Sequence, residues 1–157
     1  MSDPLGLRRA TAHDAYALWL WRNEEESRRL SFEHAPIGWA EHVAWLRDRL
    51  DDAGAIVLVA EFADGRPVGS IRFDTQDDWR TARLSFVLAP EVRGQGLARP
   101  LVLEGVQYLR GSHPRAAIHA EVHTVNERSL RVFRGAGWIE DASSDGCVRF
   151  WSRDRVP

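Results

Sequence analysis

The stretch that most constrains the fold is SFVLAPEVRGQGLARPLVLEG, residues 85–105. An apolar run typical of a strand ends at a proline, and a segment with Gly94 and Gly96 leads into an apolar pattern with helical spacing. A helix that begins after a glycine-rich turn leaves its first backbone N–H groups without partners, and its dipole favours negative charge there. The junction therefore predicts an anion site, to which Arg93 and Arg99 add charge. A tight turn that needs glycine only for its conformation is the alternative.

The rest of the chain alternates between strand and helix patterns. We expect strands at 5–10, 55–63, 68–73, 82–88 and 115–123, helices at 12–29, 37–50, 97–111 and 126–137, and a terminal hairpin over 138–151 turning at Asp145-Gly146. Three successive strands joined by short polar turns indicate antiparallel neighbours. The order predicts an α/β fold with a mixed sheet, in a single domain over residues 1–157.

Composition excludes several classes of function. A net charge of −2 gives no overall attraction to nucleic acid or anionic lipid, so an electropositive site must be local. Cys147 is alone, which excludes a disulfide framework and favours a reducing compartment. The first residues lack the apolar core of a secretory signal, and the run at 55–60 is too short to span a bilayer. We expect a cytoplasmic protein with no nucleic-acid or membrane partner.

Two motifs resemble those of the GNAT acyltransferase superfamily. VRGQGLA fits its Arg/Gln-x-x-Gly-x-Gly/Ala signature, and NERSLRVFRGAGW fits its Asn-x-x-Ser-x-x-x-Tyr/Phe-x-x-x-Gly-Phe/Trp motif. The predicted order of elements is also the GNAT order over nearly the whole chain. The resemblance implies a mixed, mostly antiparallel central sheet flanked by about four helices, and an acetyl-CoA-dependent N-acetyltransferase that works without a metal.

The N-terminal half is similar to one branch of that superfamily. LRRATAHDAYALWLWRNEEESRRLSFEHAPIGWAEHVAWL resembles the aminosugar N-acetyltransferases of the pseudaminic-acid pathway, through Trp-Arg-Asn, a Ser before an Ile-containing linker, and His-x-x-Trp. Ribosomal-protein N-terminal acetyltransferases share part of the pattern. The resemblance implies an amine acceptor, an aminosugar or its nucleotide conjugate, with a protein N-terminus as the alternative. The residues it assigns to the acceptor are Trp21, Arg22, Asn23, His34, His42 and Ser85.

In this superfamily the strand before the loop diverges from its parallel neighbour, and the pantetheine arm of the cofactor fills the gap. By resemblance, the pyrophosphate would lie on backbone N–H groups of the glycine loop. Arg131 or Arg134 would reach the phosphorylated ribose. The residues implied for the cofactor are Val87, Leu88, Arg93, Gly94, Gln95, Gly96, Leu97, Ala98, Arg99, Asn126, Ser129 and Phe133.

The chain departs from the superfamily pattern at the groups that move protons. Phe133 stands where many GNAT enzymes carry the tyrosine that protonates the thiolate, so water, Ser129 or the substrate must serve instead. The strand before the loop also lacks a carboxylate. His119, Glu121 and His123 alternate along the next strand and share one face, which makes Glu121 the first candidate base and the histidines the reserves.

Three other interpretations stay open on the sequence. The three polar residues of HAEVH could form a solvated sheet face, or hold the metal of a hydrolase. Without tyrosine and strand carboxylate, the chain could also be a non-catalytic acyl-CoA-binding module. The oligomeric state is open too, and a homodimer through the terminal hairpin is one option.

Overall fold

The computed structural model describes residues 4–154. Its strands are β1 Gly6–Arg9, β2 Ala55–Glu61, β3 Pro67–Asp74, β4 Thr81–Leu88, β5 Ala117–His123, β6 Ile139–Ser144 and β7 Cys147–Trp151. Its α-helices are α1 Ala15–Asn23, α2 Glu25–Leu30, α3 Trp39–Asp51, α4 Ala98–Ser112 and α5 Glu127–Gly135, with short 3₁₀ turns at Ala12–Asp14 and Pro90–Val92. The single-domain prediction for residues 1–157 includes 1–3 and 155–157, which lie outside the described residues.

All seven described strands join one sheet in the order β1-β2-β3-β4-β5-β7-β6. Every neighbouring pair is antiparallel except β4 and β5, which are parallel. The predicted mixed, mostly antiparallel α/β fold is confirmed. The terminal hairpin turns at Asp145-Gly146, with φ of 54° and 73°, as a tight hairpin with this dipeptide requires.

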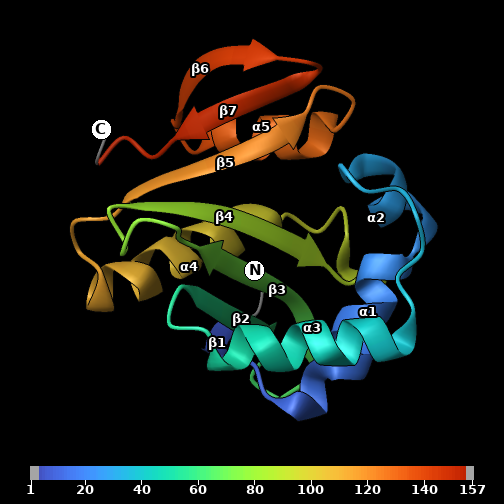
Figure 1. Cartoon of the computed structure of the whole chain (residues 1–157). Coiled ribbons are helices and arrows are strands. Elements are labelled where there is room, and N and C mark those ends of the chain that lie inside the picture. The colour runs from blue at the N-terminus through green and yellow to red at the C-terminus, as the bar shows by residue number, and fades with distance from the viewer. Residues whose placement is uncertain (1–3, 155–157) are drawn as a thin grey trace.

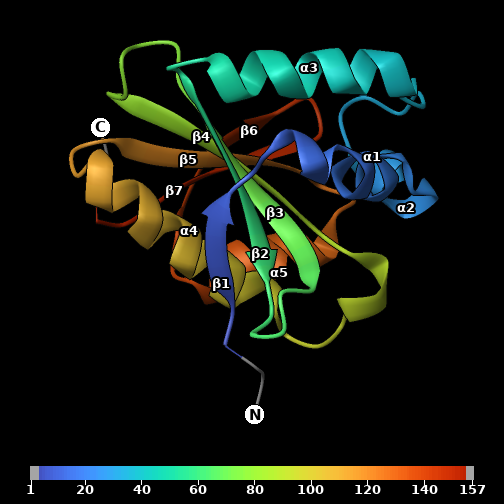
Figure 2. The same ribbon diagram turned by 90° about the horizontal axis from the view of Figure 1, so that it is seen from below.

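The helices form a layer on each face of the sheet. Figure 2 shows α1 and α3 on one face and α4 and α5 on the other. This explains why β2 is an uninterrupted apolar run rather than an alternating one, because all of its residues from Ala55 to Ala60 are buried. Gly105 permits the close approach of α4, since a Cβ there would lie 2.3 Å from the side chain of Ile71.

The N-terminal helical region differs from the prediction of one helix over 12–29. Thr11 and Asp14 form the expected capping box, but it caps a 3₁₀ turn that precedes α1. The chain then leaves the helical conformation at Glu24, with φ −59° and ψ 140°, and restarts as α2. The carboxylate of Glu24 accepts hydrogen bonds from the N–H groups of Glu26 and Ser27, so this residue ends one helix and caps the next. The split gives five α-helices where about four were expected.

Candidate active site

The site is built on the gap between β4 and β5. Their ladder holds only three residue pairs, the last of which joins Arg83 to His119. Beyond it the two strands diverge toward their C-terminal ends, as Figure 1 shows, with α2 beside the open side. The diverging strands match the expectation drawn from the GNAT resemblance.

Backbone groups line this gap from both strands. The N–H of Ala89 donates to the carbonyl of Val68 on β3. Because the main-chain groups of successive residues in a strand point to opposite sides, the N–H and C=O groups of Leu88 and Phe86 point toward the gap. Val87 instead turns its backbone toward β3, so of the two predicted cofactor residues on β4 only Leu88 offers main-chain groups to the gap. The two strand edges can take an extended, amide-bearing chain as a ladder partner.

The glycine loop after β4 has the conformation of an anion site. Gly94 and Gly96 adopt φ of 76° and 77°, which glycine tolerates and other residues rarely adopt. Within residues 4–154, the N–H groups of 94–97 donate to no protein acceptor, and α4 begins directly afterwards. Free N–H groups and a helix N-terminus fit a pyrophosphate, and Arg99 is exposed in the first turn of α4. The predicted Gln95 is exposed and donates its side-chain amide to the carbonyl of Glu91.

The side chain of Arg93 points away from this role. Its guanidinium lies 2.9 Å from the carboxylate of Glu24 and 3.0 Å from that of Glu26, and it also donates to the Oγ of Ser27. Its Nε donates to the carbonyl of Leu88. Arg93, whose charge the sequence analysis assigned to the anion site, therefore links α2 to the glycine loop.

The opposite wall of the gap comes from the start of α5. The side chain of Asn126 accepts a hydrogen bond from the N–H of Ser129 and so caps the helix. Phe133 is 1% exposed and packs against Phe86, Trp138 and Phe150. The phenyl ring in this position has no proton to transfer.

Loop, gap and helices enclose one cleft of about 1050 Å³. Ten of the twelve residues predicted for the cofactor line it, the exceptions being Gln95 and Arg99. On the other side of the sheet the cleft continues between α1, α3 and the strands. The predicted acceptor residues that line this part are Arg22, His42 and Ser85.

Three of the predicted acceptor residues do not line the cleft. Trp21 is 7% exposed and belongs to the core. Asn23 holds the loop before α3, because its side-chain amide bonds both the N–H and the carbonyl of Ile37. His34 is exposed, with its ring 6.4 Å from that of His123.

The three candidate bases have different surroundings. Glu121 lines the cleft and pairs with Arg149 at 2.9 Å, and His123 lines it with its ring 4.8 Å from that of Phe32. His119 lies outside the lining, packed on Trp151 at 4.9 Å. Burial lowers the pKa of His119, helped by the charges of Arg149 and Arg83 and opposed by Glu121 and Asp77. Of the three candidate bases, Glu121 and His123 are thus the two that line the cleft. Within residues 4–154 no group of three or more His, Cys, Asp or Glu is placed to hold a metal.

Three arginines and two glutamates line the acceptor part of the cleft: Arg22, Arg72, Arg83, Glu33 and Glu41. Burial and the nearby charge of Arg72 lower the pKa of Arg22, against an opposing effect of Glu33. Within the described residues Arg22 has no carboxylate partner, and its guanidinium donates only to the Oγ of Ser31 and the carbonyl of Glu33. Arg83 lines the same wall and is exposed.

Arg72 was not predicted from the sequence, although it carried a signal. It lies on β3, pairs with Asp74 at 2.7 Å, and places its guanidinium 5.2 Å from the ring of Trp45. In VGSIRF the polar Ser70 and Arg72 share one strand face, whereas Ile71 and Phe73 on the other face are fully buried. Polar residues on one face of a central strand indicate a wet cavity on that side.

Comparison with known proteins agrees with this geometry. The family model of the acetyltransferase (GNAT) domain matches residues 5–139. The chain belongs to the GNAT acetyltransferase family. It is therefore an acyltransferase, an acetyl-CoA-dependent N-acetyltransferase of GNAT type.

Solved structures confirm the fold of this GNAT protein. A spermidine N-acetyltransferase from Vibrio cholerae, in complex with CoA and spermine, superposes with a TM-score of 0.85 at 19% identity, over 94% of each chain. A domain from Methanocaldococcus jannaschii superposes with a TM-score of 0.82 at 17% identity, over 96% of this chain and 99% of that one. A search of the curated proteins finds no match. None of the helices within residues 4–154 is long and apolar enough to cross a bilayer.

Proposed function

We propose that this GNAT protein acetylates the amine of a small acceptor that also carries negative charge, with a nucleotide-linked aminosugar as the substrate class. Acetyl-CoA supplies the acyl group as a thioester. The single observation that carries the choice of acceptor is Arg22, a half-buried guanidinium in the cleft without a carboxylate partner among residues 4–154.

Desolvation of the charged Arg22 guanidinium lowers the stability of the folded chain unless an anion binds it. Charges buried in proteins are paired, because desolvation disfavours the charged form, and here the neighbouring charge of Arg72 adds repulsion. A phosphate or carboxylate between the two guanidiniums relieves both effects, and arginine binds such groups with two parallel hydrogen bonds. A polyamine such as the spermine bound by the Vibrio cholerae relative carries no anion that could pair with Arg22.

Each wall of the cleft has a defined task in this proposal. The N–H groups of the glycine loop hold the pyrophosphate, and Leu88 with the edge of β5 holds the amide-bearing arm in line with the acceptor. Glu121, or His123 through water, takes the proton of the attacking amine. Since Phe133 has no acidic proton, the leaving thiolate takes its proton from water, from Ser129 or from the acceptor.

The experiment is thiol release from acetyl-CoA with four acceptors. A nucleotide-linked 4-aminosugar is compared with the methyl glycoside of the same aminosugar, with spermidine and with short peptides that have free N-termini. We expect the nucleotide conjugate to react fastest. Arg22→Gln should raise its KM by about tenfold or more, the size of one charged hydrogen bond, and should leave the uncharged glycoside unaffected.

Arg47→Gln is the matched control, because Arg47 lies outside the cleft on α3 and pairs only weakly with Asp48 at 3.6 Å. Faster release with spermidine, or an equal KM change for charged and uncharged sugars, contradicts the anionic acceptor. Faster release with peptides indicates the protein N-terminal alternative. Tight acetyl-CoA binding without release from any amine indicates the non-catalytic module, which the buried Phe133 would then explain.

A further inference from the structure

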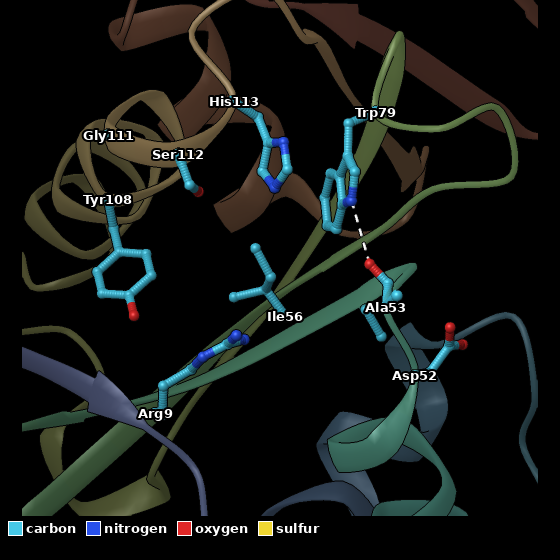
Figure 3. A pocket seen from close by; sticks show the side chains of 10 residues that line it. Arg9, Asp52, Ala53, Ile56, Trp79, Tyr108, Gly111, Ser112 and His113 are labelled. Atoms are coloured by element: carbon cyan, nitrogen blue, oxygen red, sulfur yellow. Dashed lines mark hydrogen bonds between the residues drawn. The ribbon is translucent and has the colours of Figure 1, made fainter.

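A second pocket lies away from the cleft, beside the C-terminal end of α4. Its volume is about 390 Å³, within the range of small-molecule sites, which starts at about 300 Å³. It shares no lining residue with the cleft. Figure 3 shows its walls: Tyr108 and His113 from the end of α4, Trp79 from the loop between β3 and β4, and Arg9 from β1 around the side chain of Ile56.

The tryptophan is held in this wall against the preference of its backbone. Asp78 and Trp79 adopt φ of 55° and 64°, and a bulky residue rarely occupies that region. A network fixes the loop: the carboxylate of Asp77 accepts from the hydroxyl of Thr75 and from the N–H and hydroxyl of Thr81. Strain that is secured in this way is concentrated at functional positions, and here it determines where one indole lies.

The indole stacks on a neighbouring ring, and this pair, the Trp79–His113 wall, lines the pocket. Trp79 stacks on His113 with centroids 4.3 Å apart and an angle of 14° between the planes. Its Nε1–H donates to the carbonyl of Ala53, as the dashed line in Figure 3 shows. Both rings are only partly buried, so the wall is open to the pocket. A planar ring can pack on the open face or against the edges of such a stacked pair.

Arg9 gives the pocket its charge. It is exposed, and within residues 4–154 its guanidinium has no hydrogen-bond or carboxylate partner. Asp52, the acidic lining residue, already accepts hydrogen bonds from Arg49 and from the N–H of Gly54. The hydroxyl of Tyr108 is also unbonded among the described residues, and Tyr108 is 37% exposed. Arg9 and Tyr108 together offer donors for an anion beside the flat wall.

We propose that this pocket binds a small molecule that combines a planar ring with one anionic group, a carboxylate or a phosphate. The ring packs against the Trp79–His113 wall and Ile56, and the anion pairs with Arg9. The loop that carries Trp79 continues directly into β4, and α4 connects the pocket to the glycine loop at its other end. The site is nevertheless separate from acetyl transfer, since the two cavities have no residue in common.

The test is a nuclear magnetic resonance titration of the ¹⁵N-labelled full chain. The probes are nicotinate with its neutral counterpart nicotinamide, and adenosine 5′-monophosphate with adenosine. The chain has seven tryptophans, and the indole N–H signal missing from Trp79→Phe identifies Trp79. We expect at least one acid to shift this signal at millimolar concentration. Its neutral counterpart should bind about tenfold more weakly or not at all. Which acid binds distinguishes a carboxylate ligand from a phosphate ligand.

Arg9→Gln should weaken the binding of that acid by about tenfold, and Arg115→Gln should leave it unchanged. Arg115 provides the same charge change nearby, on an exposed residue outside the lining. If none of the four probes shifts the Trp79 signal, or if the acids bind no better than their neutral counterparts and Arg9→Gln has no effect, the proposal is overturned. Shifts confined to cleft residues overturn it as well.

Discussion

Arg93→Gln separates two roles for the arginine that begins the glycine-loop motif. In the sequence this residue is a candidate phosphate ligand, whereas in the structure its guanidinium ties α2 to the loop through Glu24, Glu26 and Ser27. If the tie is its main role, the glutamine variant loses stability first. If it is a phosphate ligand, the variant loses acetyl-CoA affinity first.

The expected loss of stability follows from the geometry. The guanidinium makes two carboxylate contacts, of 2.9 and 3.0 Å, with a side chain that is 18% exposed. Breaking a buried ion pair costs about 3–5 kcal/mol, and solvent screens part of this where the carboxylates are 30% and 32% exposed. We therefore expect the free energy of unfolding to fall by about 2 kcal/mol. For a chain of this size that lowers Tm by about 4–8 °C.

Glu24 gives the same variant a pH signature. Burial raises the pKa of this carboxyl, but the hydrogen bonds from Arg93 and from the N–H groups of Ser27 and Glu26 outweigh it and lower the pKa from 4.5 to about 2. Because the folded pKa lies below the unfolded one, this stabilisation is complete above pH 4.5 and is lost as the pH falls through about 2. The difference in stability between the parent and Arg93→Gln should therefore shrink over that range.

The assay is thermal unfolding across this pH range, combined with calorimetric titration of acetyl-CoA near neutral pH. Arg99→Gln is the matched contrast, because Arg99 is exposed in the first turn of α4 and has no partner among residues 4–154. It should keep its Tm and bind acetyl-CoA more weakly. An Arg93→Gln protein with unchanged Tm and weakened acetyl-CoA binding would refute the tie.

Three further predictions concern the loop, the base and a buried histidine. Gly96→Ala and its control Gly65→Ala both place a Cβ at positive φ, 77° and 81°, so each should lose about 1 kcal/mol of stability. Only Gly96→Ala should also lower the affinity for acetyl-CoA, which calorimetry measures. Glu121→Gln should lower kcat by about 100-fold or more, as thiol release measures, whereas an unchanged kcat would move the role of base to His123. His42→Gln should flatten the dependence of stability on pH. Burial lowers the pKa of His42 against the opposing effect of its hydrogen bond to the carbonyl of Ala15, so the stability gained from the neutral imidazole is present above pH 6.5 and is lost as the pH falls below it. Denaturant unfolding on either side of that pH measures the difference.

Most of the fold follows from local signals in the sequence. Strand alternation, turn dipeptides and the proline in the first turn of α4 are local, and they predict the strands and the late helices correctly. The break at Glu24 could not be predicted in the same way, since three successive glutamates favour a helix. The break is instead stabilised by Arg93, which lies 69 residues further along the chain.

The two halves of the site differ in how well the sequence predicts them, again because one depends on local signals and the other on distant contacts. The cofactor wall is built from two contiguous motifs, so most of its predicted residues line the cleft. The acceptor wall joins α1, α3 and four strands, and only their register shows which polar residues meet. Arg72 emerged in this way, whereas Trp21 belongs to the core and Asn23 secures a loop.

The short ladder between β4 and β5 has a mechanical consequence. On one side of it β1 to β4 form an antiparallel unit, on the other side β5 to β7 form a second one, and three residue pairs are the whole of their shared ladder. An extended ligand that hydrogen-bonds to the free edges of both β4 and β5 links the two units. Its occupancy should be measurable as slower amide hydrogen exchange along β4 and β5 and as a more cooperative unfolding transition.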